Sequence, residues 1–330
     1  MTASRRSILS LCTLTLTALV STSGWAQADY PARPIKLIVP FSAGSASDTV
    51  ARAVADEMGR QIPVPVVVEN REGAGGNIGN TAVARSAPDG YTVLMGTSLM
   101  TMSVHMNAPP AYDAVKDFVP IARIGTIPLV AVASTGAPFK TWSELVAYAK
   151  ANAGKINYAS SNKGSSSHVY TEMLKREFGF DAQEVPYKNL GQAVTDTATG
   201  INHFFIANLP PTRGLIQAGQ LRPLAVGSRQ RLAAFPEVPT FAELTGRADL
   251  ELALWYGFFV PAGTPPAVVA RLNREIVKAA ETPAVRARLE SNGGALAIGT
   301  GAELGALVQS DNQRFRTLMK DLDLVPTAAK

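Results

Sequence analysis

The sequence predicts two α/β domains, each with a parallel β-sheet wound by helices on both faces. Its 330 residues exceed the usual size of a single domain. Short apolar segments alternate with amphipathic ones, as they do where strands and helices alternate. A buried strand followed by a hydroxyl-rich turn and a helix occurs once in each half of the chain. These three observations are typical of a doubly wound fold with two similar halves.

The first 28 residues resemble an export signal. Arg5 and Arg6 form a basic start, an apolar and threonine-rich segment runs from Ile8 to Val20, and Ala26-Gln27-Ala28 is a small-residue cleavage site. A membrane-spanning helix needs about 20 apolar residues, which is longer than this segment. We therefore expect export and cleavage after Ala28, by either the general or the twin-arginine route.

Composition limits the chemistry of the mature chain. Hydrophobic residues make up 46% and charged residues 17%, which suits a globular protein with a large core. The formal net charge of +5 falls by two, to about +3, without Arg5 and Arg6. No basic run with interleaved aromatic residues occurs, so nucleic-acid binding is not expected. Cys12 is the only cysteine, so a chain cleaved after Ala28 has no disulfide, cysteine nucleophile or thiolate metal site.

The first strand, turn and helix occupy residues 35–58. The apolar segment Ile35 to Val39 predicts a buried strand, which Pro40 ends because proline has no N–H for the ladder. Residues 42–47 form a small-residue turn, and we expect Ser47 to cap the following helix. The inward face of that helix is apolar: Val50, Val54 and Met58. Unpaired amides at a helix N-terminus bind anions, although any tight turn between a strand and a helix has this form.

The rest of the first half adds two strands and a glycine-rich loop. In order, we expect a strand at 65–68, a loop at 69–79, a short helix at 81–86 and a strand at 91–96. The loop does not match the dinucleotide-binding motif, and its glycines predict positive φ angles. Within it, Asn77 either binds a ligand or caps the next helix. Thr97 and Ser98 follow the third strand, at the same edge of the sheet as the turn at 42–47.

The second unit has the same plan. A linking region with strands at 119–124 and 129–133 leads to a helix at 141–152 and a strand at 156–159. Residues 160–168 then form a serine-rich turn that leads into a helix. One face of that helix carries Val169, Met173 and Leu174. Two such turns in separate halves could hold one ligand from opposite sides.

The remaining segments complete the second domain and return to the first. We expect strands at 184–187, 204–208 and 224–227, the last of them central, and a return crossing at 254–260. Three helices follow. The first has Thr264 as its cap and Pro265 at its first position, the second runs from Thr282 to about Asn292, and the third covers about 302–322.

Catalytic and metal-binding motifs are not found in the sequence. His105, His168 and His203 are far apart and lack the spacing of metal ligands. No G-x-S-x-G nucleophile motif occurs. Ser166 and His168 are close in sequence, but residues two apart at a helix start do not face each other. We therefore expect no enzymatic activity, metal or cofactor; a secreted serine hydrolase that uses Ser166 and His168 is an alternative.

Motifs along essentially the whole mature chain resemble the Bug family, the periplasmic solute-binding receptors of tripartite tricarboxylate transporters. In the first half they are residues 30–35 (YPARPI), 39–41 (VPF) with Asp48, 67–71 (VVENR) with 73–79 (GAGGNIG), and 88–92 (PDGYT). In the second half they are residues 157–161 (NYASS), 185–188 (VPYK) and 261–266 (PAGTPP).

The resemblance implies a type II periplasmic-binding-protein fold, or Venus flytrap, in which two doubly wound α/β lobes are joined by two crossovers. Residues 29–130 and 257–330 would form lobe 1, and residues 131–256 would form lobe 2. It also implies a periplasmic monomer that binds a small organic carboxylate between its lobes. The protein would deliver this ligand to the large and small membrane subunits of the transporter. A sensory receptor that signals through a membrane partner is an alternative.

The resemblance further implies a ligand site of backbone amides, hydroxyls and bridging waters, with no catalytic residue and no metal. Its residues in lobe 1 are Phe41, Ser42, Ala43, Gly44, Ser47, Asp48, Thr97 and Ser98. Its residues in lobe 2 are Ser161, Ser165, Ser166, His168, Tyr187 and Asn208. Neutral dipoles that converge on a carboxylate can hold it without an arginine.

Three features depart from the family pattern. Ser45 replaces a usual glycine, and Ser42 and Ala43 stand where prolines are common. Ala207 stands where an aspartate commonly precedes Asn208. Without that carboxylate a contact for an amine or hydroxyl is lost, which favours a plain or aromatic acid over an amino acid as the ligand.

Overall fold

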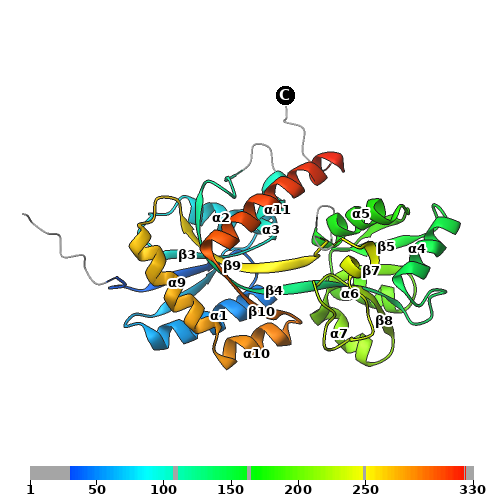
Figure 1. Cartoon of the computed structure of the whole chain (residues 1–330), viewed down its shortest axis with the longest axis horizontal. Coiled ribbons are helices and arrows are strands. Elements are labelled where there is room, and N and C mark those ends of the chain that lie inside the picture. The colour runs from blue at the N-terminus through cyan, green and yellow to red at the C-terminus, as the bar shows by residue number, and fades with distance from the viewer. Residues whose placement is uncertain (1–29, 107–110, 162–164, 248–249, 323, 325–330) are drawn as a thin grey trace, which may run out of the picture.

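Residues 30–106, 111–161, 165–247, 250–322 and 324 are described by the computed structural model of the chain. They form two α/β lobes that lie side by side and are joined by two long strands (Figure 1). These strands are β4 (Phe118–Ser134) and β9 (Ala253–Pro261). The predicted export signal and its cleavage site lie outside the described residues.

The sheet of lobe 1 contains the first strands of the chain. Its members are β1 (Ile35–Val39), β2 (Val66–Asn70), β3 (Thr92–Thr97) and β10 (Ala295–Thr300), together with β9 and the first part of β4. β1 pairs in parallel with β2 and β3, as predicted, whereas the pairs β3–β9, β9–β4 and β4–β10 are antiparallel. The sheet is therefore mixed, because the chain leaves lobe 1 along β4 and returns along β9 in the opposite direction.

Helices cover both faces of this sheet and enclose two apolar clusters. One face carries α1 (Ala46–Gln61), α9 (Pro266–Ala280) and α10 (Pro283–Ser291). The other carries α2 (Asn77–Ala84), α3 (Leu99–Ser103) and α11 (Gly301–Asp321), with the 3₁₀ turns η1 (Ala74–Gly76) and η2 (Val104–Met106). The predicted inward face of α1 is buried at Val50, Val54 and Met58. Burial of each such side chain stabilises the fold by about 1.5–3 kcal/mol.

The sheet of lobe 2 is formed by the last part of β4 and four further strands. These are β5 (Asn157–Ser160), β6 (Gln183–Pro186), β7 (Phe204–Asn208) and β8 (Leu221–Val226), in the order β8-β4-β7-β5-β6. One face carries α4 (Trp142–Ala151), α5 (Ser166–Phe178) and α8 (Phe241–Thr245), and the other carries α6 (Leu190–Ala198) and α7 (Leu209–Gln217). Lobe 2 is thus doubly wound like lobe 1.

Two strand predictions were wrong in detail. The two separate strands predicted in the linking region are one strand, β4, which pairs with β9 as far as Pro128 and with β7 from Leu129 onward. The strand predicted as central in lobe 2 is β8, which lies at the edge and whose ladder pairs only with β4 among the described strands. Its last three residues, Leu224, Ala225 and Val226, are nevertheless buried, and this burial gives an edge strand the apolar pattern of a central one.

The start of α9 also differs from the prediction. Its cap is Pro265 and not Thr264, whose hydroxyl donates to the carbonyl oxygen of Pro261 at 2.8 Å. α10 begins at the predicted place, after Thr282, whose side chain caps the helix by accepting a hydrogen bond from the amide of Val285. α11 begins after Thr300, which forms a capping box with Glu303.

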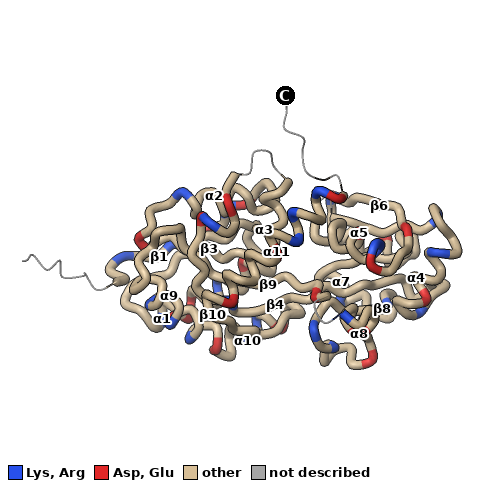
Figure 2. The backbone as a smooth tube through the Cα atoms, turned by 45° about the horizontal axis from the view of Figure 1, so that its top comes forward, with Lys and Arg blue, Asp and Glu red and all other residues tan. Residues whose placement is uncertain are grey.

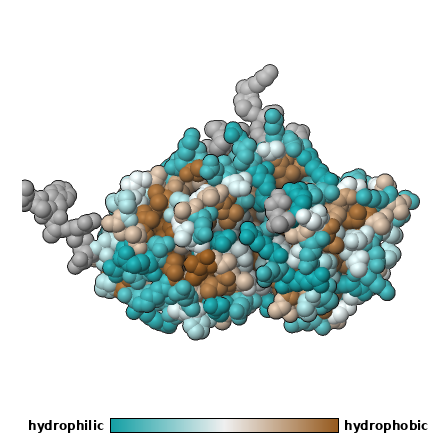
Figure 3. Space-filling model, viewed as in Figure 1, coloured by the Kyte–Doolittle hydropathy of each residue, from teal (hydrophilic) through white to brown (hydrophobic). Residues whose placement is uncertain are grey.

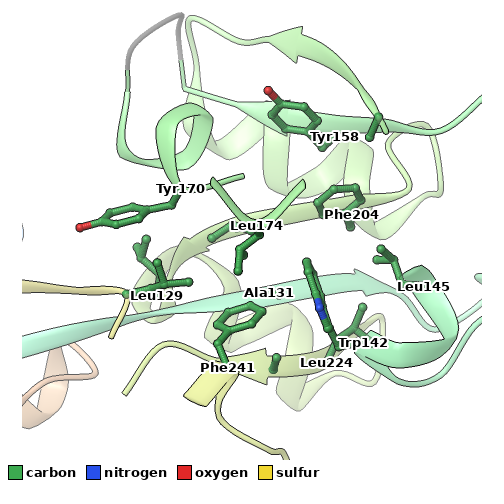
Figure 4. Close-up of a cluster of buried hydrophobic side chains, with 14 of the residues drawn as sticks. Leu129, Ala131, Trp142, Leu145, Tyr158, Tyr170, Leu174, Phe204, Leu224 and Phe241 are labelled. Carbon is green, nitrogen blue, oxygen red and sulfur yellow. The ribbon is translucent and has the colours of Figure 1, made fainter. Parts of the chain in front are cut away.

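Aromatic side chains centred on Trp142 fill the core of lobe 2 (Figure 4). The Trp142 ring has Phe241 at 4.9 Å and Phe204 at 6.0 Å between centroids, both edge to face. The same cluster includes side chains from the C-terminal half of α11, which begins in lobe 1. They are Phe315, Leu318 and Met319. This helix therefore packs against both lobes.

Charged residues of both signs are interspersed over the two lobes (Figure 2). On the face shown in Figure 3, hydrophilic residues separate small apolar areas. The exposed large apolar side chains among the described residues come from different elements: Val67, Ile78, Val115, Leu190, Ile201 and Ile298. Single exposed apolar side chains of this kind are ordinary on a globular protein.

Gly227 lies where β4 passes from one sheet to the other. Its amide donates to the carbonyl oxygen of Leu129 at 2.7 Å, and its carbonyl oxygen accepts from the amide of Leu252 at 2.8 Å. A Cβ atom at this position would lie 2.2 Å from the carbonyl oxygen of Leu252. We expect Gly227→Ala to lower the free energy of unfolding by about 2–3 kcal/mol, since backbone would have to move.

Urea unfolding followed by circular dichroism measures this effect. The matched control is Gly59→Ala in α1, where a Cβ atom meets nothing within 4 Å. That substitution is expected to stabilise the protein by about 0.5–1 kcal/mol, because alanine favours a helix interior. Equal stability of the two variants would show that Gly227 is not sterically required.

Candidate functional site

The strand ends that precede the predicted binding residues point toward each other. β3 is antiparallel to β9, which is antiparallel to β4, so β3 runs in the direction of β4 and ends toward lobe 2. β7 is antiparallel to β4 within lobe 2, so it ends toward lobe 1. β1 is parallel to β3, and β5 is parallel to β7. The carboxyl ends of β1, β3, β5 and β7 therefore all face the region between the lobes.

Pairing along β4 gives the separation of these two edges. Tyr256 on β9 pairs with both Thr97 of β3 and Gly125 of β4. Asn208, the last residue of β7, pairs with Leu129. The two β4 residues are four positions apart, which corresponds to about 13 Å of strand. A small organic molecule with hydrogen-bonding groups can bridge this distance.

The turn of lobe 1 is capped by Ser45 and not by Ser47. The Ser45 hydroxyl accepts from the amide of Asp48 at 3.2 Å, and the Ser45 carbonyl oxygen accepts from the amide of Thr49 at 3.0 Å. The amides of the first two helical residues, Ala46 and Ser47, have no partner within the helix. Ser45, which departs from the family pattern, is thus the cap of α1, and Ser47 lies inside the first turn of the helix.

Ser47 lies beside the crossing strand β9. It is buried, and its side chain lies near the hydroxyl of Tyr256. Burial raises the pKa of Tyr256 to about 12, and the nearby Ser47 hydroxyl partly opposes this rise. Because Tyr256 also pairs with Thr97, this contact brings the end of β3 and the start of α1 together.

Asp48 holds the turn in shape through its carboxylate. The carboxylate accepts from the amide of Gly44 at 2.8 Å, from Nδ2 of Asn70 at 2.8 Å and from Nε of Arg52 at 3.0 Å. Burial raises its pKa, but these hydrogen bonds outweigh burial and hold the pKa below its usual value. Asn70 Nδ2 also donates to the carbonyl oxygen of Phe41 at 3.0 Å. The negative charge of Asp48 is therefore compensated within lobe 1.

Arg52 and Asn70 were not predicted as site residues. Arg52 follows Asp48 by four positions, a spacing that favours an ion pair on a helix. Asn70 belongs to one of the motifs that carry the family resemblance. Those two signals could have identified both as supports of the turn.

Ser42, Ala43 and Gly44 form the exposed part of this turn. The Ser42 hydroxyl donates to the carboxylate of Glu72, which lies in the glycine-rich loop. The loop has the positive φ angles predicted for it, at Gly73, Gly75 and Gly76, and also at Ala74.

Asn77 neither caps α2 nor faces the turn. Its Nδ2 donates to the carbonyl oxygen of Ser103 at 3.1 Å, and its Oδ1 accepts from the Ser103 hydroxyl at 2.9 Å. Gly76 occupies the cap position, without a side chain to donate or accept. Asn77 therefore joins α2 to α3, a role that no local spacing signals.

Thr97 is the last residue of β3 and Ser98 follows it directly; both are buried. The Thr97 hydroxyl accepts from the amide of Leu99 at 3.2 Å. The Ser98 hydroxyl is buried without a hydrogen-bond partner among the described residues. A buried hydroxyl in this state is costly, so it marks a position where another group can add a bond.

The turn of lobe 2 repeats the cap of lobe 1. The Ser165 hydroxyl accepts from the amide of His168 at 3.3 Å, and the Ser165 carbonyl oxygen accepts from the amide of Val169 at 2.9 Å. The amide of Ser161 donates to the Ser167 hydroxyl at 2.9 Å, which closes the turn. Ser166 is the first residue of α5, so its amide has no partner within the helix. Residues 162–164 of this turn lie outside the described residues.

The His168 ring is buried against lobe 2. Its Nε2 lies 3.7 Å from Oε2 of Glu184, whose Oε1 accepts from the Ser160 hydroxyl at 2.6 Å. The side chain thus connects α5 to the neighbouring strands. His168, which was predicted as a site residue, therefore lies close to the turn with its ring directed at Glu184.

The Tyr187 hydroxyl is hydrogen bonded within lobe 2, which leaves the ring as the part of the side chain that can contact a ligand. The hydroxyl donates to Oδ2 of Asp196 at 2.8 Å and accepts from Nδ2 of Asn202 at 2.8 Å. The amide of Tyr187 donates to the carbonyl oxygen of Ser160 at 2.8 Å, next to the serine-rich turn. The half-buried ring is therefore fixed beside that turn.

Asn208 stands at the cap position of α7 but cannot cap it. Pro210 and Pro211 follow in the first turn, and neither has an N–H for the Asn208 side chain to accept. Its Oδ1 is buried without a hydrogen-bond partner among the described residues. The two prolines thus leave this amide side chain available at the lobe 2 edge.

The described residues lack the features of two other classes of protein. No group of three or more His, Cys, Asp or Glu side chains there is arranged to hold a metal ion. Within the same residues, none of the helices has the length and hydropathy required to cross a membrane.

Comparisons with known proteins agree with this geometry. Residues 50–324 match a family model described as the tripartite tricarboxylate transporter family receptor. Protein BugT of Bordetella pertussis is 36% identical over 294 residues, which are 88% of this chain and 90% of that protein. The matching family and the similar solved structures are periplasmic binding proteins and not enzymes.

Two similar solved structures contain a bound acid. One, from Rhodopseudomonas palustris with adipate, is 30% identical with a TM-score of 0.76, and the match covers 91% of this chain and all of the other (100%). The second, MatC from Rhodopseudomonas palustris with bound malate, is 30% identical with a TM-score of 0.71, and the match covers 88% and 99% of the two chains. The present chain therefore belongs to the receptor family of the tripartite tricarboxylate transporters and has its periplasmic-binding-protein fold.

Proposed function

We propose that this protein binds a small organic carboxylate between its lobes in the periplasm and delivers it to the membrane subunits of a tripartite tricarboxylate transporter. The observation that carries the proposal is the pair of serine-capped helix starts at α1 and α5. Each follows a strand that ends toward the other lobe. Closure of the lobes would exclude water and strengthen each hydrogen bond to the ligand.

The ligand contacts come from both edges. In lobe 1 we assign them to Phe41, Ser42, Ala43, Gly44, Ser47, Thr97 and Ser98, with Asp48 as the group that shapes the turn. In lobe 2 we assign them to Ser161, Ser165, Ser166, Tyr187 and Asn208, with His168 as a support behind the turn. Backbone amides at two helix starts favour a negatively charged ligand, because each start carries a positive partial charge.

The class of ligand follows from the same groups. Two edges about 13 Å apart, each with its own donors, suit an acid with polar groups at both ends. Adipate and malate, bound by the two similar proteins, have this form. Ala207 offers no charge next to Asn208, so an amine has no counter-ion there.

We further propose the limits of the lobes and of the mature chain. Residues 29–130 and 257–330 form lobe 1 and residues 131–256 form lobe 2. The partner change of β4 after Pro128 supports this division. The mature protein begins after Ala28 and acts as a monomer.

Thermal-shift screening of organic acids tests the proposed function. The protein is purified without denaturation, examined by native mass spectrometry for a retained ligand, and then heated with a panel that includes adipate, malate and aromatic acids. We expect at least one carboxylate to raise the melting temperature, because a ligand that binds only the folded state stabilises it. A panel without effect, together with turnover of a neutral substrate, would contradict the proposal.

The double substitution Ser165→Ala with Ser166→Ala tests the site in lobe 2. We expect the dissociation constant for the selected acid to rise at least about tenfold, since each lost hydrogen bond is worth about 1 kcal/mol. Isothermal titration calorimetry measures this change.

Thr141→Ala is the control for the loss of a helix cap. Thr141 caps α4 by accepting from the amide of Glu144 at 3.2 Å, in the same way as Ser165 caps α5. This variant is expected to lose about 1 kcal/mol of stability with unchanged affinity. An unchanged affinity in the serine variant as well would remove Ser165 and Ser166 from the site.

A further inference from the structure

Tyr170 carries a buried hydroxyl that no contact within lobe 2 explains. It lies on α5, one turn after the serine-rich turn, and is 1% exposed. Its ring packs edge to face against Phe315 of α11, with 5.9 Å between centroids. Its hydroxyl has no hydrogen-bond partner among the described residues. Figure 4 shows this hydroxyl pointing out of the apolar cluster, away from Leu174 and Phe204.

A candidate partner for that hydroxyl is Ser98 of lobe 1. Ser98 directly precedes α3, and Leu99 and Met102 of α3 pack against the cluster that contains Tyr170. The Ser98 hydroxyl is also buried without a partner among the described residues. Burial raises the pKa of Tyr170, and the nearby Ser98 hydroxyl acts against this rise. The two hydroxyls are thus neighbours that do not complete a hydrogen bond in the present arrangement.

The buried hydroxyls of Tyr170 and Ser98 belong to opposite lobes and each lack a hydrogen bond. A small movement of one lobe toward the other can form a hydrogen bond between them. Each buried hydroxyl without a partner destabilises the arrangement that contains it. A hydrogen bond between them would satisfy both at once. A serine hydroxyl that accepts a bond becomes a stronger donor through its own proton, because hydrogen bonds in series polarise one another.

We propose that Tyr170 is a positioning residue for closure of the lobes: its hydroxyl donates to Ser98 Oγ when the lobes close on a bound acid, and Ser98 then donates its own proton to that acid. The inference rests on the proposed function, because Ser98 is one of the proposed ligand contacts. It adds a residue, on the opposite lobe, that acts on the ligand only through Ser98. The bond contributes to closure and to affinity together.

A double-mutant cycle with Tyr170→Phe and Ser98→Ala tests the proposal. The probes are adipate and malate, and their binding is measured by isothermal titration calorimetry and stopped-flow fluorescence. We expect Tyr170→Phe to weaken binding about fivefold, mainly through faster dissociation, because one hydrogen bond of the closed form is lost. In the Ser98→Ala background the same substitution is expected to change affinity less than twofold, so additive effects of the two substitutions would overturn the proposal.

The melting temperature of the ligand-free protein separates this role from a purely structural one. Tyr170→Phe is expected to raise it by roughly 2 °C, since a buried hydroxyl without a partner is removed. The matched control is Tyr158→Phe. The Tyr158 hydroxyl is buried in lobe 2 and donates to Oε1 of Glu172 at 2.7 Å, so its loss should lower the melting temperature and leave affinity unchanged. A fall in melting temperature for Tyr170→Phe, with unchanged affinity, would also overturn the proposal.

A wild-type protein that binds neither acid would show that these two acids are not its ligands, and the proposed function is then decided by the full acid panel. The contact is then judged from the distance between spin labels at Arg60→Cys and Lys150→Cys. Both positions are exposed, one in each lobe, and the only natural cysteine is Cys12. We expect the fraction of molecules with the shorter distance between the two labels to be smaller in Tyr170→Phe than in the protein with Tyr170. An unchanged distribution of distances overturns the proposal.

Discussion

The continuity of β4 determines where everything else in the molecule lies. One strand of 17 residues belongs to both sheets, pairs with β9 up to Pro128 and pairs with β7 from Leu129. Because antiparallel pairing with β4 fixes the direction of β9 and β7, it also fixes the direction of the parallel strands that neighbour them. The strand ends of the two lobes must then face each other. The location proposed for the ligand site is a consequence of this single shared strand.

The two helix starts at this location use the same local chemistry. Ser45 and Ser165 each accept from the amide three residues ahead and leave the first amides of a helix without an internal partner. Around them the polar side chains differ. Lobe 1 compensates Asp48 with Arg52 and Asn70, whereas lobe 2 places His168 against Glu184. In the proposed function the amides recognise a negative charge, and the surrounding side chains discriminate what is attached to it.

Much of this arrangement follows from patterns that a sequence carries locally. Apolar segments and small-residue turns located β1, β3, β5 and β7 and both turns between the lobes. The errors occurred where the deciding contact is distant in sequence. Ser45 and Ser47 are both good caps, and only the path of the preceding turn selects Ser45. Asn77 bonds to Ser103, and β8 is buried at an edge, because elements far along the chain pack against them. Periodicity contains no information on such contacts.

The packing of α11 against both lobes affects how they can move. Two strands alone would let one lobe bend and also twist relative to the other. Phe315, Leu318 and Met319 add a third connection, away from the line of the strands, and Arg176 of α5 reinforces it by donating to the carbonyl oxygen of Asp321 at 2.7 Å. We expect this third connection to oppose twisting of one lobe against the other more strongly than the two strands would alone.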